Sequence, residues 1–256
     1  MSVSAQTEAR RTGEPHATYP VVEIFGPTVQ GEGPDAGRPA YFVRFGGCDW
    51  RCTWCDSMHA VDPGQVREHA DRLSVGDIVE RLGALRKGPQ LVVLSGGNPA
   101  LLQLGELVGQ LQRSGREVAV ETQGSVWRDW LGTVDRLVVS PKPPSSGMAT
   151  PEHADQFAVF AERLAAAGRV AHAVLKVVIF DEDDLEWAQD LHSAYPHLPL
   201  YLSAGTDVDI DEAQAVAAMR ERYRWLCEAV AARRALSDSR VLPQLHVIAW
   251  GTARGV

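Results

Sequence analysis

The chain has 256 residues, of which 45% are hydrophobic and 23% are charged. This composition is that of a soluble globular protein, and the length is ample for one large core. The formal net charge of -8 argues against nucleic acid as the main partner, because such binding relies on Lys and Arg to neutralise phosphates, and no apolar run is long enough to span a membrane.

Residues 1–18 are polar and lack the apolar core of a signal peptide. We therefore expect a disordered N-terminal tail ahead of a single domain over residues 19–256. The chain has four cysteines, and free cysteines without a leader point to the reducing cytoplasm.

Short apolar runs alternate with stretches of helical period along the chain. In chain order we predict strand 41–45, helix 75–85, strand 91–94, helix 100–113, strands 118–121 and 136–139, helix 151–167, strand 174–179, helix 184–194, strand 200–203, helix 211–235 and a weaker strand 245–248. Ser74 is the predicted N-cap of the first helix, and Gly115 and Gly168 are predicted to end the second and third.

Strands that alternate with helices in this way pair in parallel and are buried on both faces. Six or seven strands are too few to close an eight-stranded barrel. The fold class that we predict is therefore α/β, with an incomplete, TIM-like barrel of about six parallel strands.

Three of the four cysteines lie within eight residues, and they are Cys48, Cys52 and Cys55. Thiols this close suit one metal centre better than disulfides. One interpretation is a [4Fe-4S] cluster with three protein ligands, which keeps one iron open. The alternative is a structural zinc site completed by His59. The cluster is favoured because all three thiols sit in one loop after strand 41–45, where Trp50 and Trp54 would shield it from water.

Polar turns follow three more of the predicted strands: Ser95-Gly96-Gly97-Asn98-Pro99, Glu121-Thr122-Gln123-Gly124 and Ser140-Pro141-Lys142. Each alone could be an ordinary strand-to-helix turn. Chemistry in parallel α/β folds collects at the carboxyl ends of strands, so these turns and the cysteine loop together predict one site. The paired glycines would let backbone N–H groups approach a ligand closely.

Arg44 lies inside an otherwise apolar strand and must be paired. Its partner could be an internal carboxylate such as Glu32, or the carboxylate of a substrate. Near the C-terminus, Gln244 and His246 would share one face of the short strand 245–248 and either line the same pocket or face solvent.

The cysteine loop resembles that of the radical S-adenosylmethionine (SAM) enzymes, and residues 95–99 resemble their GGEP motif. A narrower set resembles the 7-carboxy-7-deazaguanine synthases: Gln30-Gly31-Glu32-Gly33, Arg44-Phe45-x-Gly47-Cys48, Cys55-Asp56-Ser57, Ser140-Pro141-Lys142 and Gln244-x-His246. The resemblance runs in order from about Val22 to His246, which is nearly the whole chain.

The resemblance implies a radical SAM core and a carbon–nitrogen lyase. Its reaction would convert 6-carboxy-5,6,7,8-tetrahydropterin to 7-carboxy-7-deazaguanine with loss of ammonia, in deazapurine or queuosine biosynthesis. The implied cofactors are a [4Fe-4S] cluster, SAM bound through its amino and carboxylate groups at the open iron, and Mg2+. A flavodoxin-like electron donor and a homodimer are implied as well.

Residue roles follow from the matched positions. The cluster would be held by Cys48, Cys52 and Cys55, which form the catalytic centre. The SAM site would comprise Trp54, Asp56, Gly97, Asn98, Glu121, Ser140, Lys142 and Ser203. The pterin would be held by Val29, Gln30, Gly31, Glu32, Ser95, His246 and Arg44, the last on its carboxylate, and Mg2+ by Ser57. Two positions depart from the family pattern. Asn98 replaces a Glu and cannot supply a negative charge to an ammonium group, and Ser57 replaces a Thr but keeps the hydroxyl.

Two other functions fit parts of the sequence. An activase that makes a glycyl radical on a partner protein would share the cysteine loop, but its peptide substrate has no clear need for Arg44 or Ser57. A zinc or iron–sulfur protein that only mediates interactions would not need the polar strand ends.

Overall fold

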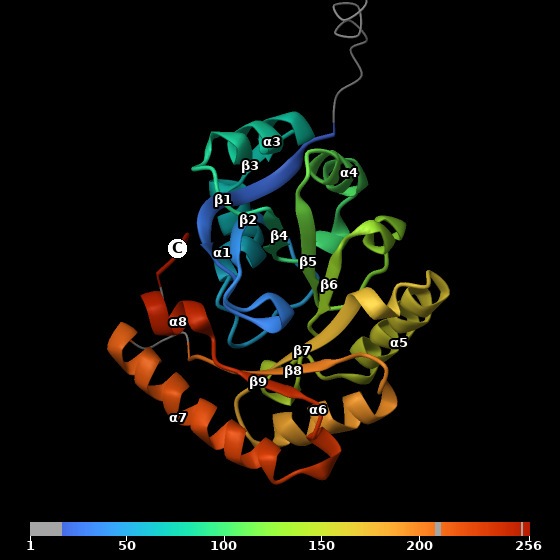
Figure 1. Cartoon of the computed structure of the whole chain (residues 1–256), viewed down its shortest axis with the longest axis vertical. Coiled ribbons are helices and arrows are strands. Elements are labelled where there is room, and N and C mark those ends of the chain that lie inside the picture. Colours follow the sequence, from blue (N-terminus) through green and yellow to red (C-terminus); the bar gives the residue numbers. More distant parts are fainter. Residues whose placement is uncertain (1–16, 208–210, 252) are drawn as a thin grey trace, which may run out of the picture.

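The structure is a computed structural model that describes residues 17–207, 211–251 and 253–256. Most of the predicted tail, residues 1–16, lies outside the described residues. All strands of the described residues join one nine-stranded sheet in the order β3-β1-β2-β4-β5-β6-β7-β8-β9 (Figure 1). Their bounds are β1 Tyr19–Val29, β2 Pro39–Phe45, β3 Asp71–Leu73, β4 Leu91–Gly96, β5 Glu117–Thr122, β6 Arg136–Val139, β7 Ala173–Ile179, β8 Leu200–Ala204 and β9 Arg240–Leu242.

From β2 to β9 all neighbouring strands are parallel, which makes seven parallel strands. Only β1 runs antiparallel, to both β2 and β3. The edge strands β3 and β9 do not pair with each other, so the sheet is open. This confirms the predicted α/β fold with an incomplete barrel.

The helices are α1 Met58–Val61, α2 Pro63–His69, α3 Val75–Ala84, α4 Gly105–Arg113, α5 Pro151–Ala166, α6 Glu182–Ala194, α7 Glu212–Ala231 and α8 Leu245–Trp250. Figure 1 shows α3 to α7 around the outside of the curved sheet. As predicted, Ser74 caps α3, in a capping box with Asp77. Gly115 and Gly168 follow α4 and α5 with φ of 81° and 66°, the left-handed backbone that ends helices. No described helix is both long and apolar enough to cross a membrane.

The main core lies between the sheet and the outer helices, where side chains such as Leu94, Leu107, Phe160 and Leu185 are fully or almost fully buried. A smaller cluster lies on the opposite face of the first parallel strands and consists of Ala40, Leu91, Val93 and Ala119, with Phe42 packed on it. The parallel strands are therefore buried on both faces, as their continuous apolar sequence predicts.

The predicted strand 245–248 is wrong, because these residues begin helix α8, and the strand of this region is β9, which ends at Leu242. Pro243 follows β9 and has no N–H to donate to a ladder. The chain then turns into a helix in which the Ile248 N–H donates to the Gln244 carbonyl at 3.2 Å. A short apolar run does not distinguish a strand from a helix by periodicity.

Other differences concern the start of the chain and helix ends. The analysis of the sequence missed β1, β3, α1 and α2. Strand β1 contains Glu23 and the Gly26-Pro27 pair, and its register with β2 shifts at two places, so it lacks a clean alternation. The predicted helix 100–113 is split into a 3-10 turn, Pro99–Leu101, and α4.

Candidate functional site

A cavity of about 610 Å³ opens at the carboxyl ends of the parallel strands. It is lined by residues in or directly after β2, β4, β5, β6 and β7. The predicted site residues that line it are Val29, Gln30, Gly31, Glu32, Arg44, Cys48, Cys52, Trp54, Cys55, Asp56, Ser57, Ser95, Gly97, Glu121, Ser140, Lys142 and His246. Tertiary structure thus brings together segments from both ends of the chain.

Two predicted residues do not line the cavity. Ser203 is fully buried in β8, and its hydroxyl has no hydrogen-bond partner within the described residues. Asn98 is 1% exposed and, unlike the preceding Gly96 and Gly97, is not among the lining residues. The structure therefore gives neither side chain direct access to a ligand in the cavity.

The cysteine loop lines the cavity with three free, half-buried thiols. Burial raises the pKa of the Cys48 and Cys52 thiols, and burial together with the adjacent aspartate raises the pKa of Cys55 to about 12. The Trp50 N–H lies 3.4 Å and the Gln123 amide 3.6 Å from Cys48 Sγ. Such donors stabilise the thiolate that forms when a thiol releases its proton and binds a metal, so the loop fits the expected cluster.

His59 does not join the cysteines. Its ring is buried, and Nε2 lies 3.3 Å from Glu23 Oε1. Burial and then the positive charge of Arg44 lower the pKa of His59. Residues 17–207, 211–251 and 253–256 contain no group of three Cys, His, Asp or Glu side chains that could hold a single metal ion. The arrangement therefore does not favour a zinc site completed by His59, which needs its ligands to converge on one ion.

The paired glycines after β4 serve the close packing of the cysteine loop. A Cβ at Gly97 would lie 2.0 Å from the Gly47 carbonyl oxygen, and Gly96 has φ of 116°. The Gly97 N–H donates to the Phe45 carbonyl at 2.9 Å. The Gly97 N–H is therefore already used inside the protein and does not approach a ligand, contrary to the expectation from the sequence. The glycine pair instead allows the cysteine loop to pack closely against the end of β4.

The side chain of Asn98 is saturated with hydrogen bonds. Its Nδ2 donates to Asp49 Oδ1 and to Ser125 Oγ, both at 3.0 Å. Its Oδ1 accepts from the Thr122 hydroxyl at 2.8 Å and from the Ala100 N–H at 3.2 Å. Asn98 therefore joins the cysteine loop to the ends of β4 and β5.

Arg44 is paired with Glu23, not with Glu32. Its Nε lies 3.3 Å from Glu23 Oε2, because the register of β1 and β2 sets the two residues opposite each other. Its Nη1 donates to Ser57 Oγ at 2.5 Å, and Ser57 in turn donates to Asp56 at 2.9 Å. The guanidinium is thus held at the cavity wall beside a hydroxyl and two carboxylates.

Glu32 is paired with Lys176, a buried residue of β7 that the sequence analysis did not single out. Lys176 Nζ lies 2.6 Å from Glu32 Oε2, and Gln244 Nε2 donates to Glu32 Oε1 at 3.0 Å. Burial alone would raise the pKa of Glu32, but Lys176 and His246 lower it to about 2. Burial alone would lower the pKa of Lys176, but Glu121 and Glu32 raise it. The pair therefore stays ionised at neutral pH.

The other cavity walls differ in character. Glu121 accepts hydrogen bonds from Gln30 at 2.9 Å and from Ser95 at 3.2 Å. Another wall is aromatic: the centres of the Trp54 and Phe180 rings lie 5.0 Å apart, and the ring planes are inclined at 34°. Lys142 Nζ lies 5.9 Å from the centre of the Trp54 ring and donates to Ser140 Oγ at 3.0 Å. A flat heteroaromatic ring can pack on this wall while its polar edges meet the amides and carboxylates.

His246 lies at the start of α8 and packs against the backbone of Gly31. A Cβ at Gly31 would lie 2.2 Å from His246 Nδ1, so any side chain at this position would displace the imidazole. The Leu245 N–H donates to the Gly31 carbonyl at 3.1 Å. Gln244 and His246 do reach the cavity, but from the N-terminus of a helix and not from the predicted strand.

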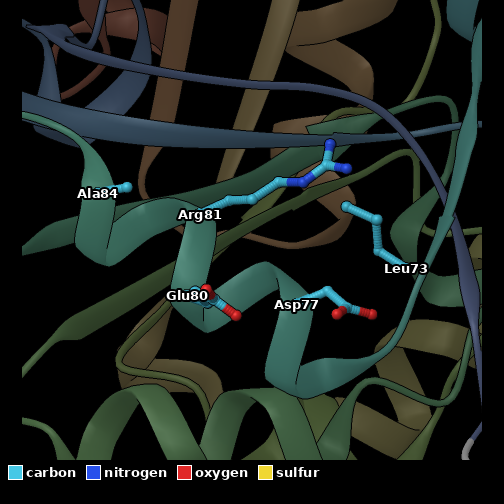
Figure 2. Close-up of a pocket in the computed structure, with 5 residues that line it drawn as sticks. All are labelled: Leu73, Asp77, Glu80, Arg81 and Ala84. Atoms are coloured by element: carbon cyan, nitrogen blue, oxygen red, sulfur yellow. The ribbon is translucent and has the colours of Figure 1, made fainter.

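A second hollow lies on α3 and is lined by Leu73, Asp77, Glu80, Arg81 and Ala84 (Figure 2). Two of its charged groups have structural partners: Asp77 caps α3, and Arg81 pairs with Asp71 at 2.6 Å. Nothing in it resembles a chemical site.

Several residues of the cavity were not among the predicted site residues. Lys176 could have been found by the argument used for Arg44, since both are charged residues inside apolar strands. Phe180 follows β7 directly, and Gln123 lies in a polar turn after β5, so both carry the strand-end signal. Glu23, which pairs with Arg44 but does not itself line the cavity, had no such signal, because β1 was not predicted.

Comparisons with known proteins agree with this geometry. Residues 42–140 match the Radical SAM superfamily. The 7-carboxy-7-deazaguanine synthase of Bacillus cereus is 40% identical over 241 residues, which is 93% of this chain and 98% of that protein. The synthase of the same name from Bacillus subtilis is 41% identical over 242 residues, with the same coverage. The crystal structure of QueE from Escherichia coli has a TM-score of 0.65 at 23% identity, covers 90% of this chain and 96% of that chain, and shows a shared fold.

The Glu32–Lys176 pair predicts a large stability effect. Glu32→Gln leaves the Lys176 ammonium buried without its carboxylate, so the free energy of unfolding in urea should fall by about 3–5 kcal/mol. Glu32→Gln combined with Lys176→Met should recover most of this loss, because no buried charge remains unpaired. The pKa of Glu32 is lowered from 4.5 to about 2, so its ionised form stabilises the fold above about pH 4.5, and this contribution is lost as the pH falls towards 2.

The matched control is Arg81→Ala, which removes a half-exposed ion pair with Asp71 and should cost less than about 1 kcal/mol. Equal stability of Glu32→Gln and the unmodified protein would contradict the buried pair.

Proposed function

The chain belongs to the 7-carboxy-7-deazaguanine synthase family of radical SAM enzymes, and from this premise we propose how its cavity serves the reaction. The enzyme is a carbon–nitrogen lyase of deazapurine biosynthesis that converts 6-carboxy-5,6,7,8-tetrahydropterin to 7-carboxy-7-deazaguanine with loss of ammonia. The observation that carries the proposal is that the three cysteines, Arg44 and Ser57 line one cavity at the strand ends.

Cys48, Cys52 and Cys55 are the residues that would hold the [4Fe-4S] cluster. When bound, the cluster and SAM supply the one-electron chemistry that begins with removal of a hydrogen atom from the substrate. The protein excludes water from this centre with the Trp50 and Trp54 side chains. Trp54, Asp56, Gly97, Glu121, Ser140 and Lys142 line the cavity and are the residues that we propose for SAM.

The pterin would lie on the side of the cavity formed by the loop after β1, by β4 and by α8. We propose Val29, Gln30, Gly31, Glu32, Ser95 and His246 as the residues that hold it. Arg44 would bind its carboxylate, since a guanidinium matches a carboxylate with two parallel hydrogen bonds. Its guanidinium already contacts Glu23 and Ser57, so it is partly buried and oriented before the substrate binds.

A Mg2+ site at Ser57 is supported by the chemistry of its neighbours. Ser57 Oγ lies 2.9 Å from Asp56 Oδ1, and both residues line the cavity. Mg2+ prefers oxygen ligands and keeps several waters, so a hydroxyl, a nearby carboxylate and the substrate can complete its shell.

Four further proposals rest on the family resemblance and on the sequence. The described cysteines are free, which supports the reducing cytoplasm as the location. The resemblance supports a flavodoxin-like electron donor and a homodimer, and a single radical SAM domain over residues 19–256. Neither the glycyl-radical activase nor a zinc protein without catalysis gains support from the cavity or from the relatives.

Product analysis tests the function. Anaerobically reconstituted protein should hold about four irons per chain. With SAM, reductant, Mg2+ and 6-carboxy-5,6,7,8-tetrahydropterin it should release 7-carboxy-7-deazaguanine, detected by mass spectrometry. Cys55→Ala should lose the cluster and the product.

Cys227→Ala is the matched control, because Cys227 lies on α7 and does not line the cavity; it should keep both. Bound zinc without SAM cleavage in the unmodified protein would overturn the function.

Arg44→Ala should raise the KM for the carboxylated pterin by about 10- to 100-fold, because a hydrogen-bonded ion pair to the substrate is lost. Cleavage of SAM without substrate should continue. Arg240→Ala, which removes an exposed arginine on β9, is the control and should leave KM unchanged. An unchanged KM in Arg44→Ala would mean that Arg44 does not bind the substrate carboxylate.

Ser57→Ala should raise the Mg2+ concentration that gives half-maximal turnover by about tenfold or more, because an oxygen ligand is removed. Ser57→Thr keeps the hydroxyl and should retain the Mg2+ requirement of the unmodified enzyme. If Ser57→Ala responds to Mg2+ like the unmodified enzyme, Ser57 is not a ligand.

A further inference from the structure

The aromatic wall of the cavity is held by a chain of hydrogen bonds that leads away from the cavity. Trp54 Nε1 donates to Ser145 Oγ at 2.9 Å, and Ser145 Oγ donates to Asp184 Oδ2 at 2.6 Å. An indole only donates and an ionised carboxylate only accepts, so the single hydroxyl proton of Ser145 points to Asp184 and its oxygen accepts from Trp54. Neither Ser145 nor Asp184 lines the cavity itself.

Asp184 also reaches the second ring of the wall, through the backbone. Its Oδ2 accepts from the Phe180 N–H at 3.0 Å, and its Oδ1 accepts from the Ser145 N–H at 2.9 Å. The Trp54 and Phe180 rings both line the cavity and lie 5.0 Å apart between their centres. One carboxylate therefore fixes the loop that carries Ser145 and the end of β7, and through them both rings.

The burial of Asp184 is costly by itself. Its side chain is fully buried and forms no ion pair within the described residues. Burial raises the pKa of its carboxyl, while the hydrogen bonds from Ser145 and Phe180 oppose that rise. An apolar side chain would avoid the cost of burying a carboxylate without a cation. What an apolar side chain cannot do is accept from the Ser145 hydroxyl and the Phe180 N–H together.

The loop that carries Ser145 also holds the cysteine loop. The Thr53 N–H donates to the Ser146 carbonyl at 3.0 Å, and the Thr53 hydroxyl donates to the Ser145 carbonyl at 2.8 Å. Thr53 and Trp54 are the two residues between the second and third cysteines. The Trp54 ring therefore lies beside the thiols, where the adenosyl part of SAM would lie, and not on the side of the cavity proposed for the pterin.

We infer that Asp184 and Ser145 are positioning residues that orient the Trp54 ring, together with Phe180, for the adenine base of SAM. This inference rests on the proposed function. The χ2 torsion of an aromatic side chain has broad minima, so the hydrogen bond at Nε1 selects one orientation of the indole. A ring that is already fixed in the cavity wall can pack on a flat base without losing side-chain freedom when the base binds.

Equilibrium binding to cluster-loaded protein tests the inference without turnover. The probes are S-adenosylhomocysteine, which carries the adenine base, and 6-carboxypterin, which carries the pterin ring. Ser145→Ala removes the acceptor of the Trp54 N–H and keeps the backbone hydrogen bonds of its loop. It should raise the dissociation constant of S-adenosylhomocysteine by about threefold to tenfold, as expected for the loss of one hydrogen bond, and leave that of 6-carboxypterin unchanged. Asp184→Asn should raise the first constant at least as much, because an amide cannot accept from all three donors.

Trp54→Phe separates positioning from a general structural role. Phenylalanine keeps an aromatic ring but has no N–H, so Ser145→Ala should have no further effect on S-adenosylhomocysteine binding in a Trp54→Phe background. The matched control is Asp183→Asn, which changes the exposed neighbour of Asp184 on α6 and should leave both dissociation constants unchanged.

Three results would overturn the inference. Ser145→Ala could weaken both probes equally, neither probe, or 6-carboxypterin alone; its effect could be the same with and without Trp54→Phe; or Asp184→Asn could leave S-adenosylhomocysteine binding unchanged. If the unmodified protein forms the product, these results leave the proposed function intact. Unmodified protein that takes up no cluster and forms no product would overturn the proposed function itself.

Discussion

The ion pair between Glu32 and Lys176 is the interaction on which the arrangement of the cavity depends. Lys176 is 5% exposed, and a buried ammonium is stable only beside a carboxylate with well-formed hydrogen bonds. Glu32 satisfies this requirement from the loop after β1, far from Lys176 in the sequence. Gln244 donates to the second oxygen of the same carboxylate and so brings α8 to the cavity. One carboxylate thereby joins the beginning, the middle and the end of the chain.

The same need to pair charges explains the position of Arg44. The antiparallel strand β1 covers the outer edge of β2 and sets Glu23 opposite Arg44. The guanidinium is thus partly buried and oriented, while its contact with Ser57 is one that a substrate carboxylate can replace. Arg44 therefore contributes both to the stability of the fold and to the proposed binding of the substrate.

The cysteine loop is held in a different way, by its backbone. The Asn98 N–H donates to the Gly47 carbonyl, and the Gly47 N–H donates to the Ala60 carbonyl, both at 2.8 Å. The contact between Gly47 and Gly97 is too close for any side chain at position 97. Because backbone groups fix the loop, the three thiols are left free for ligands. A rigid backbone with free side chains is what a metal-binding loop requires.

The sequence by itself determined the alternation of strands and helices, the cysteine loop and the polar strand ends, because these depend on local periodicity and spacing. It also indicated that Arg44 needs a partner. Only the tertiary structure decided that this partner is Glu23 and that Glu32 belongs to Lys176, since both pairs join segments whose contact depends on strand order and register. Residues 245–248 form a helix after Pro243 ends the strand, and α8 packs against Gly31; the short apolar run by itself allows a strand and a helix equally. Only the folded structure distinguishes Asn98 from a ligand-binding residue, because its side chain is buried and all four hydrogen-bond positions of its amide are occupied within the protein. Burial and hydrogen-bond partners are properties of the folded chain, and no spacing of residues encodes them.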